Sequence, residues 1–175
     1  MRKLSIVILT FIFTLMAVPT HAQSAKNAVK VLEKLEARCA SGVSYLDYRN
    51  ALVNAKFSVN LYLESPKSSK IEGLTASIRK VMAHYEFVGR AWQDALSNRG
   101  NSILFSEGME LEIVGRYPTT DKPSSEGGAR LDNRILMIEA FRIIWGVASD
   151  ELKITKSLSD KEYSGQEKQG VGIEF

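Results

Sequence analysis

Few residues of this chain could do metal or acid–base chemistry. Beyond the first 22 residues His84 is the only histidine, and Cys39 is the only cysteine of the chain. Standard zinc sites use several His or Cys ligands, and ferritin-like di-iron bundles need paired Glu-x-x-His motifs. Because Val81 stands three residues before His84, even one such motif is absent. The sequence therefore predicts no metal centre and no cofactor.

Two kinds of chemistry at His84 stay open as alternatives. The chain lacks the C-x-x-C-H motif of covalent haem attachment. A non-covalent haem could still use His84 with Met82, Met109 or Met137. A Ser–His–acid triad would also have to use His84, and nothing nominates its partners. A periplasmic enzyme or haem-type electron carrier with a cryptic site is thus the alternative to a non-enzymatic protein.

The tyrosines and tryptophans form a more informative set, because they fall on inner or boundary positions of the expected helices. Core packing is the plain interpretation, with the polar tips of these rings finding partners at the ends of the helices. The sharper interpretation is a small cleft between helices that binds an apolar or aromatic ligand. The candidate cleft residues are Tyr48, Tyr62, Tyr85, Trp92 and Trp145.

The first 22 residues have the three parts of an export signal in the right order. Arg2 and Lys3 precede an apolar run over 4–18, and Pro19 and the small residue Ala22 follow. An uncleaved membrane anchor is the alternative, but a spanning helix needs about 20 apolar residues. We expect cleavage after Ala22, a periplasmic or secreted protein, and no membrane span in the mature chain.

The composition is that of one globular domain, with 45% hydrophobic and 25% charged residues. Without Arg2 and Lys3 the chain holds 21 basic and 20 acidic residues, a net charge of +1. This balance gives no global electrostatic reason to bind nucleic acid. The acids alternate with Lys and Arg, which is typical of solvated helix faces rather than of paired catalytic carboxylates. The partner, a protein or a small molecule, stays unknown.

Apolar periodicity and capping residues predict two helices, over about 25–40 and about 45–64. Ser24 is the expected N-cap of the first helix. Ser44 caps the second, and Asp47 completes its capping box. Because it lies on the apolar stripe, Cys39 is expected to be a buried hydrophobe rather than a reactive thiol. The stripe of the first helix is Ala28, Leu32, Leu35 and Cys39, and that of the second includes Tyr48, Leu52, Ala55, Val59 and Tyr62.

A third and a fourth helix are expected over about 70–98 and about 132–154. Ser69 and Glu72 predict a capping box for the third, and Asp132 is the candidate N-cap of the fourth, with a Leu131–Leu136 staple. An oligomer on the seam of the third helix is a further alternative. That seam is Ile71, Leu74, Ile78, Val81, Tyr85, Val88, Trp92 and Ala95, and the buried face of the fourth helix is Ile135, Ile138, Phe141, Trp145, Ala148 and Leu152.

The connection over 101–130 is the part that the pattern describes least. Its short apolar runs fit either a helix over 109–115, which we favour, or a hairpin. Residues 119–128 have the composition of a flexible loop. The whole connection is either a lid over the end of the helices or an insertion, and we favour the insertion. Residues 156–175 are polar, which predicts a disordered tail.

The segments GVSYLDY (42–48), ALVNAK (51–56) and IIWGVASDEL (143–152) resemble bacterial exported helical proteins of no assigned function. This resemblance implies a helical fold outside the cytoplasm and transfers no catalytic residue. The pattern as a whole predicts an all-α antiparallel four-helix bundle over 23–155, with a long irregular connection before the last helix. The function that we expect is that of a non-enzymatic binding or interaction module.

Overall fold

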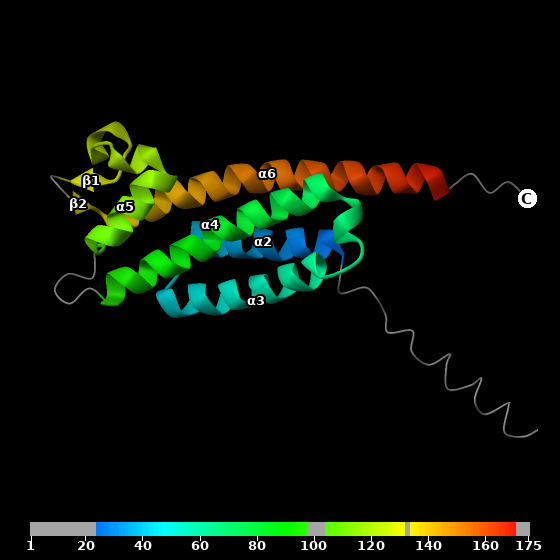
Figure 1. Ribbon diagram of the computed structural model, residues 1–175, viewed down its shortest axis with the longest axis horizontal. Coiled ribbons are helices and arrows are strands. Elements are labelled where there is room, and N and C mark those ends of the chain that lie inside the picture. The colour runs from blue at the N-terminus through cyan, green and yellow to red at the C-terminus, as the bar shows by residue number, and fades with distance from the viewer. Residues whose placement is uncertain (1–23, 98–103, 132–133, 171–175) are drawn as a thin grey trace, which may run out of the picture.

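The computed structural model describes residues 24–97, 104–131 and 134–170, and this part of the chain is mostly helical (Figure 1). The predicted all-α class is confirmed, since the only sheet within these ranges is one two-stranded pair. The expected export signal and its cleavage site lie outside the described residues. None of the described helices combines the length and the apolar character needed to cross a bilayer.

The first two helices, α2 (Ala25–Ala40) and α3 (Tyr45–Leu63), begin where their capping residues predicted. The Ser24 hydroxyl accepts a backbone N–H bond from the first turn of α2. The Ser44 hydroxyl accepts the Asp47 backbone N–H at 3.2 Å and donates to the Asp47 carboxylate at 2.7 Å. Each cap satisfies donors that a helix start leaves without partners, so both starts are fixed by local sequence.

Helix α4 (Glu72–Ser97) begins differently from the prediction. Ser69 lies inside a 3-10 helix (Ser68–Lys70), and its hydroxyl donates back to the Pro66 carbonyl at 3.0 Å. The expected Ser69–Glu72 capping box is therefore wrong, because the hydroxyl turns away from the helix that it was expected to cap.

The apolar seam of α4 is confirmed and is buried within the same chain. Helix α4 packs against α2, α3 and α6, the last helix (Met137–Gly170). Most of the seam is therefore covered within the chain, and an oligomer built on it stays an untested alternative. The buried members are Leu74, Ile78, Val81, Tyr85, Val88 and Ala95, with Ile71 and Trp92 partly buried.

The connection before α6 is ordered and contributes to the core. The expectation of a helix is confirmed by α5 (Glu107–Arg116). The expectation of a flexible loop over 119–128 is wrong, since most of that stretch forms 3-10 turns. This segment buries Phe105, Ile113, Tyr117, Thr120, Ala129 and Ile135, so it behaves as a cap on the helices rather than as an insertion. Its other elements are the 3-10 helices Pro118–Asp121 and Ser124–Glu126 and the antiparallel strands β1 (Arg130–Leu131) and β2 (Arg134–Ile135).

Helix α6 starts later and ends later than predicted. The candidate N-cap Asp132 lies outside the described residues, and Leu131 is exposed in β1, so the expected staple is wrong. The tail expected to be disordered over 156–175 is helical as far as Gly170. Thr155 and Ser159 are buried there, and small hydroxyl side chains of this kind are not counted in an apolar pattern.

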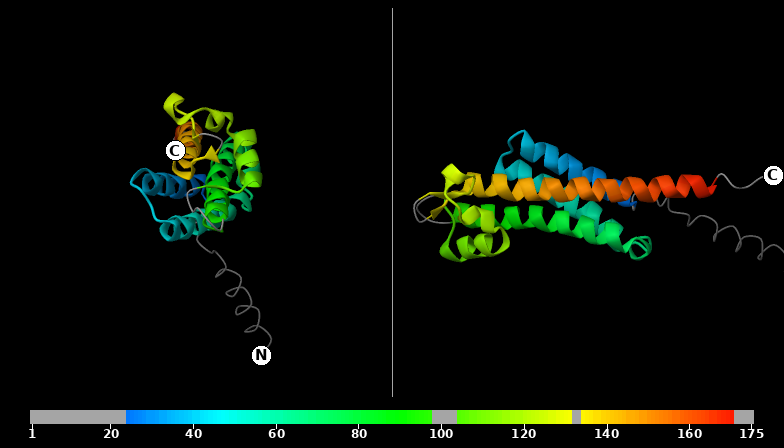
Figure 2. Two further views of the ribbon diagram at one scale, coloured as in Figure 1. Left: turned by 90° about the vertical axis from the view of Figure 1, so that its left-hand side faces the viewer. Right: turned by 90° about the horizontal axis from the view of Figure 1, so that it is seen from above.

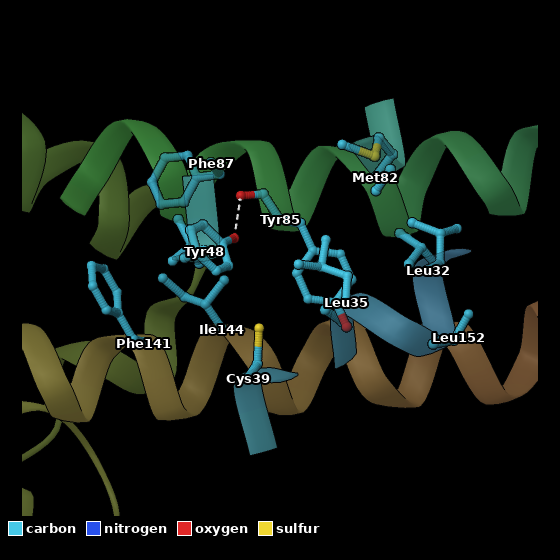
Figure 3. Close-up of a cluster of buried hydrophobic side chains, with 14 of the residues drawn as sticks. Leu32, Leu35, Cys39, Tyr48, Met82, Tyr85, Phe87, Phe141, Ile144 and Leu152 are labelled. Atoms are coloured by element: carbon cyan, nitrogen blue, oxygen red, sulfur yellow. Dashed lines mark hydrogen bonds between the residues drawn. The ribbon is translucent and has the colours of Figure 1, made fainter. Parts of the chain in front are cut away.

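The core lies between the four long helices, which Figure 1 shows as elongated elements with the cap segment at one end. Helix α6 contacts α4 and α2, and α3 contacts α2 and α4. Figure 3 shows Leu35 of α2 beside Tyr85 of α4, and Leu32 of α2 and Leu152 of α6 belong to the same buried cluster. The exposed member of the predicted α6 face is Ile138.

Candidate functional site

Three of the candidate cleft residues form one aromatic cluster in the core. The ring centroids of Tyr48 and Trp92 are 5.5 Å apart, those of Tyr48 and Trp145 5.9 Å, and those of Trp92 and Trp145 6.2 Å. All three pairs are tilted, a geometry that aromatic quadrupoles favour. The cluster extends through ring contacts to Tyr45, Phe105 and Phe141, three residues outside the predicted cleft set.

A hydrogen bond joins Tyr85 to this cluster, whereas Tyr62 forms its hydrogen bond elsewhere. The Tyr48 hydroxyl donates to the Tyr85 backbone carbonyl at 2.7 Å, as Figure 3 shows. Burial raises the pKa of Tyr48, so the phenol stays neutral and keeps its proton as a donor. Tyr62 lies apart from this contact, where its hydroxyl is 2.8 Å from the Thr75 hydroxyl. Tyr62 is therefore a core residue of another region and lines neither of the grooves described below.

A groove of about 600 Å³ lies between α2 and α6, on one side of the aromatic cluster. We call it the α2/α6 groove. Figure 2 shows α2 running obliquely to α6, so the two helices diverge toward the C-terminal end of α2. Its apolar and small lining residues include Ala37, Cys39, Tyr85, Ile138, Trp145 and Gly146.

The groove is open because small residues face it from both helices. Ala37 lines it from α2, and Gly146 lines it from α6. A Cβ atom built on Gly146 would meet nothing within 4 Å, so space is free directly above that helix. Ile138, in the first turn of α6, is 68% exposed at the groove. Ile138 lines this hollow together with Tyr85 and Trp145, and an apolar, concave lining with aromatic rings is typical of small-molecule sites.

Cys39 contributes an apolar side chain to the wall of the groove, and its thiol is not reactive. Its side chain is buried, and burial, with a smaller contribution from Glu36, raises its thiol pKa to about 12. The nucleophilic form of cysteine is the thiolate, which is scarce when the pKa is this high. The prediction of a buried hydrophobe is confirmed.

The polar groups at the rim are paired with each other. The Ser149 hydroxyl donates to the Glu36 carboxylate at 2.5 Å, and the Arg142 guanidinium donates to Glu139 at 2.9 Å. Among the described residues that line the groove, no serine or cysteine stands next to a histidine base. The arrangement can therefore bind an apolar group, and it offers no activated nucleophile.

The lone histidine lies under the cap segment instead. His84 Nδ1 is 2.7 Å from the Tyr117 hydroxyl, and its Nε2 is buried without a hydrogen-bond partner among the described residues. Burial lowers the pKa of His84, so the ring is neutral near pH 7. His84 lines neither the α2/α6 groove nor the α3/α4 groove described below. Neither groove therefore offers space for a haem beside His84.

Trp145 also carries a buried polar atom, at the boundary between the cluster and the groove. Its indole N–H has no partner within hydrogen-bond geometry among the described residues. The same N–H is near enough to the Tyr48 hydroxyl to lower that group's pKa slightly, against the larger and opposite effect of burial. The ring of Trp145 therefore lines the groove while its polar edge is turned toward the protein.

A second groove, of about 320 Å³, lies between α3 and α4, and we call it the α3/α4 groove. Tyr48 lines it and is also in ring contact with Trp145, which lines the α2/α6 groove. Two of the candidate residues, Tyr85 and Trp145, thus belong to one groove, and Tyr48 belongs to the other. The single cleft that the sequence suggested is replaced by two grooves on either side of one aromatic wall.

The small residues that open the α2/α6 groove are not among the residues predicted for the cleft. Ala37 and Ala40 stand three apart on α2, and Gly146 lies within an otherwise apolar part of α6. Small residues at helical spacing on one face are a signal that could have indicated the groove. The pairing of His84 with Tyr117 had no such signal, because 33 residues of sequence separate them.

Comparisons of this chain with models of protein families, with curated proteins and with solved structures give no match in any of the three.

Proposed function

We propose that this chain is an exported, non-enzymatic binding module. Its four long helices form an antiparallel bundle, and the α2/α6 groove binds an apolar or aromatic small molecule. The bundle is supported by the contacts of α6 with α4 and α2, together with the short turns that join α2 to α3 and α3 to α4. Export is supported by the apolar run over 4–18 after two basic residues, and by the resemblance to exported helical proteins.

The observation that carries the binding function is the open apolar floor of the α2/α6 groove. Ile138 is exposed there beside Trp145 and Tyr85, and no described side chain fills the space above Gly146. Covering an exposed isoleucine contributes about 2 kcal/mol, and aromatic stacking adds about 1 kcal/mol. These gains are offset in part by the entropy that a ligand loses on binding, so these two contacts alone do not fix the affinity for a small aromatic compound.

Filling the groove tests this proposal without weakening the fold. Gly146→Leu places a side chain in the open space, and leucine is a better helix former than glycine by about 1 kcal/mol. We expect the mature protein to bind the apolar fluorescent probe N-phenyl-1-naphthylamine saturably, and the variant to bind it at least tenfold more weakly. The measurement is probe fluorescence against protein concentration.

The matched control is Gly73→Leu, in the first turn of α4. A Cβ there also meets nothing within 4 Å, and Gly73 is exposed and does not line the groove. We expect the control variant to bind the probe like the unchanged protein. Equal binding by all three proteins, or loss of binding in the control alone, would overturn the proposal.

Export is tested independently by the mass of the chain recovered from its native host. We expect a mature chain that begins at Gln23 in the extracytoplasmic fraction. An intact chain of 175 residues in the cytosol would contradict export and would leave the groove proposal standing.

A further inference from the structure

Helix α3 has apolar side chains on two opposite faces, and only one of these faces is covered. Its inner face buries Tyr48, Ala55 and Val59. On its outer face Leu46, Val53 and Phe57 are 65%, 60% and 66% exposed. Figure 1 places α3 at the lower edge of the molecule.

The three exposed side chains form a line rather than a scatter. Leu46, Val53 and Phe57 are separated by seven and four residues, which places them on one side of a helix over about 16 Å. Single exposed hydrophobes are ordinary, whereas an aligned set beside a groove indicates a contact surface. We call these three residues the α3 stripe.

The α3/α4 groove runs along one border of the α3 stripe, and Val53 belongs to both. Tyr45, Tyr48 and Leu52 give it apolar walls. The helices approach closely here because a Cβ on Gly89 of α4 would come within 2.8 Å of the Leu52 side chain. The α3 stripe forms a ridge, and the α3/α4 groove forms a hollow that runs parallel to it. A ridge beside a groove is the kind of surface against which another helix packs.

The charged rim of this groove is mostly basic. It carries Arg49, Lys56 and Arg90 against the single carboxylate of Glu86. Lys56 pairs with Glu86 at 2.8 Å, and Arg90 pairs with Glu112 at 3.0 Å. Within the part of the chain that the structure describes, the exposed Arg49 forms no ion pair. The guanidinium of Arg49 on this rim can therefore pair with a carboxylate of another molecule.

From these observations we infer that the α3 stripe and the α3/α4 groove dock an acidic amphipathic helix of a partner protein. Apolar side chains of that helix lie on Leu46, Val53 and Phe57, and its carboxylates lie along the Arg49–Lys56 border. A second copy of this chain would bring its own basic rim against this one, which charge repulsion opposes. A flat lipid surface would leave the groove unfilled. The inference does not rest on the proposed function, because the α2/α6 groove belongs to other helices.

A designed peptide tests this inference directly. The probe is a fluorescein-labelled helical peptide of about 20 residues, with leucines at positions i, i+4, i+7 and i+11 and glutamates along one border. Its partner probe carries lysine in place of every glutamate. We expect the mature protein to bind the glutamate peptide saturably in fluorescence anisotropy, at least about tenfold more tightly than the lysine peptide, because like charges at the rim repel.

Variants on the surface decide whether the binding uses this stripe. Phe57→Gln should weaken binding of the glutamate peptide at least about tenfold, as loss of an apolar anchor does, and Arg49→Gln should weaken it about threefold. The matched control is Leu111→Gln, on α5, where the leucine is 75% exposed and outside the stripe. It should bind the peptide unchanged. All three substitutions are at exposed positions, and circular dichroism checks that each variant is folded.

Four results would overturn the inference. The first is equal affinity for the two peptides, or no binding of either. The second is a Phe57→Gln variant that binds the glutamate peptide like the unchanged protein. The third is binding to phosphatidylglycerol vesicles that Phe57→Gln removes, which would assign the surface to a membrane. The fourth is a dimer in sedimentation that Phe57→Gln dissociates, which would assign it to a second copy.

Discussion

The four long helices and the cap segment, over 104–131 and 134–136, share one apolar core and differ in the polar contacts that fasten them. In the helices, buried side chains such as Leu32, Ile78 and Ile144 meet from three directions. In the cap segment, charged and polar groups make many of the connections to the helices. Asp94 of α4 accepts the backbone N–H of Ser106 at 2.8 Å and its hydroxyl at 2.7 Å.

A second polar clamp lies within the cap segment and joins its beginning to its end. The Arg134 guanidinium donates to the Glu110 carboxylate at 2.7 Å and to the Phe105 carbonyl. The same carboxylate accepts the Ile135 backbone N–H at 3.3 Å. Because the cap segment supplies few of the buried apolar side chains and depends more on these local clamps, we expect the helices to unfold as one unit and the cap segment to open separately, at lower free energy.

The largest effect should come from a core ring. Tyr48→Ala removes a fully buried side chain that touches Trp92 and Trp145, and we expect a loss of about 3–5 kcal/mol in the free energy of unfolding. Tyr48→Phe, which loses only the hydrogen bond to Tyr85, should cost about 1 kcal/mol. Urea denaturation followed by circular dichroism measures both. Equal losses for the two variants would show that packing is not what the ring supplies.

Loss of the Arg134 clamp should destabilise the cap segment and leave the four long helices unchanged. Arg134→Ala should cost about 1–2 kcal/mol of local stability, discounted because the side chain is 41% exposed. Amide hydrogen exchange should accelerate over 104–136 and stay unchanged in α4. Arg142→Ala, which breaks a surface pair with Glu139, is the control and should change neither region. Faster exchange throughout α4 would contradict the separation of the two regions.

Acidification should weaken the junction between the two regions by a smaller amount. Burial lowers the pKa of His84 in the folded state, although Glu151 opposes this shift and Lys80 and Arg116 add to it. The unfolded chain, with an ordinary pKa near 6.5, then binds the proton first. Stability is therefore full above about pH 6.5 and falls as the pH drops below that value.

The measurement is the free energy of unfolding at pH 7.5 and at pH 5.5. The unchanged protein should lose more stability over this interval than His84→Gln, which has no titrating group at that position. An identical loss in the two proteins would show that other groups set the pH dependence.

The smallest effect is expected at the surface bridge between α4 and the cap segment. Glu112 pairs with Arg90 and with Arg116 at 3.0 Å each, and the Arg90 hydrogen bond lowers the Glu112 pKa. These side chains are partly exposed, so Glu112→Gln should cost under about 1 kcal/mol. The loss should shrink further in 0.5 M salt, since exposed pairs are screened. A loss as large as that of Arg134→Ala would contradict this ranking.

The same contrast explains what the sequence could predict. The buried stripes of α2 and α4 and the caps at Ser24 and Ser44 depend on residues three or four apart, so their pattern is visible in the chain. The contacts of Arg134 with Glu110 and of His84 with Tyr117 join residues 24 and 33 apart, and no local pattern marks them. The extension of α6 was missed because its buried contacts there use Thr155 and Ser159.

The sequence could predict which types of residue form the candidate site, but not how they are arranged. The sequence indicated that aromatic rings would gather, and Tyr48, Trp92 and Trp145 do so. It could not indicate that Tyr62 would bond Thr75 elsewhere, because that depends on where α3 meets α4. The α2/α6 groove depends on the angle between α2 and α6 and on Gly146, which only the assembled helices define.

The claim that the α2/α6 groove is a binding site is tested most directly by the indole N–H signals of the two tryptophans in a two-dimensional NMR spectrum. Trp145 lines the groove and Trp92 does not. Addition of N-phenyl-1-naphthylamine should shift the Trp145 signal saturably, move the Trp92 signal less, and leave both unmoved in Gly146→Leu. Two signals that stay in place in the unchanged protein, or that move equally in Gly146→Leu, would contradict it.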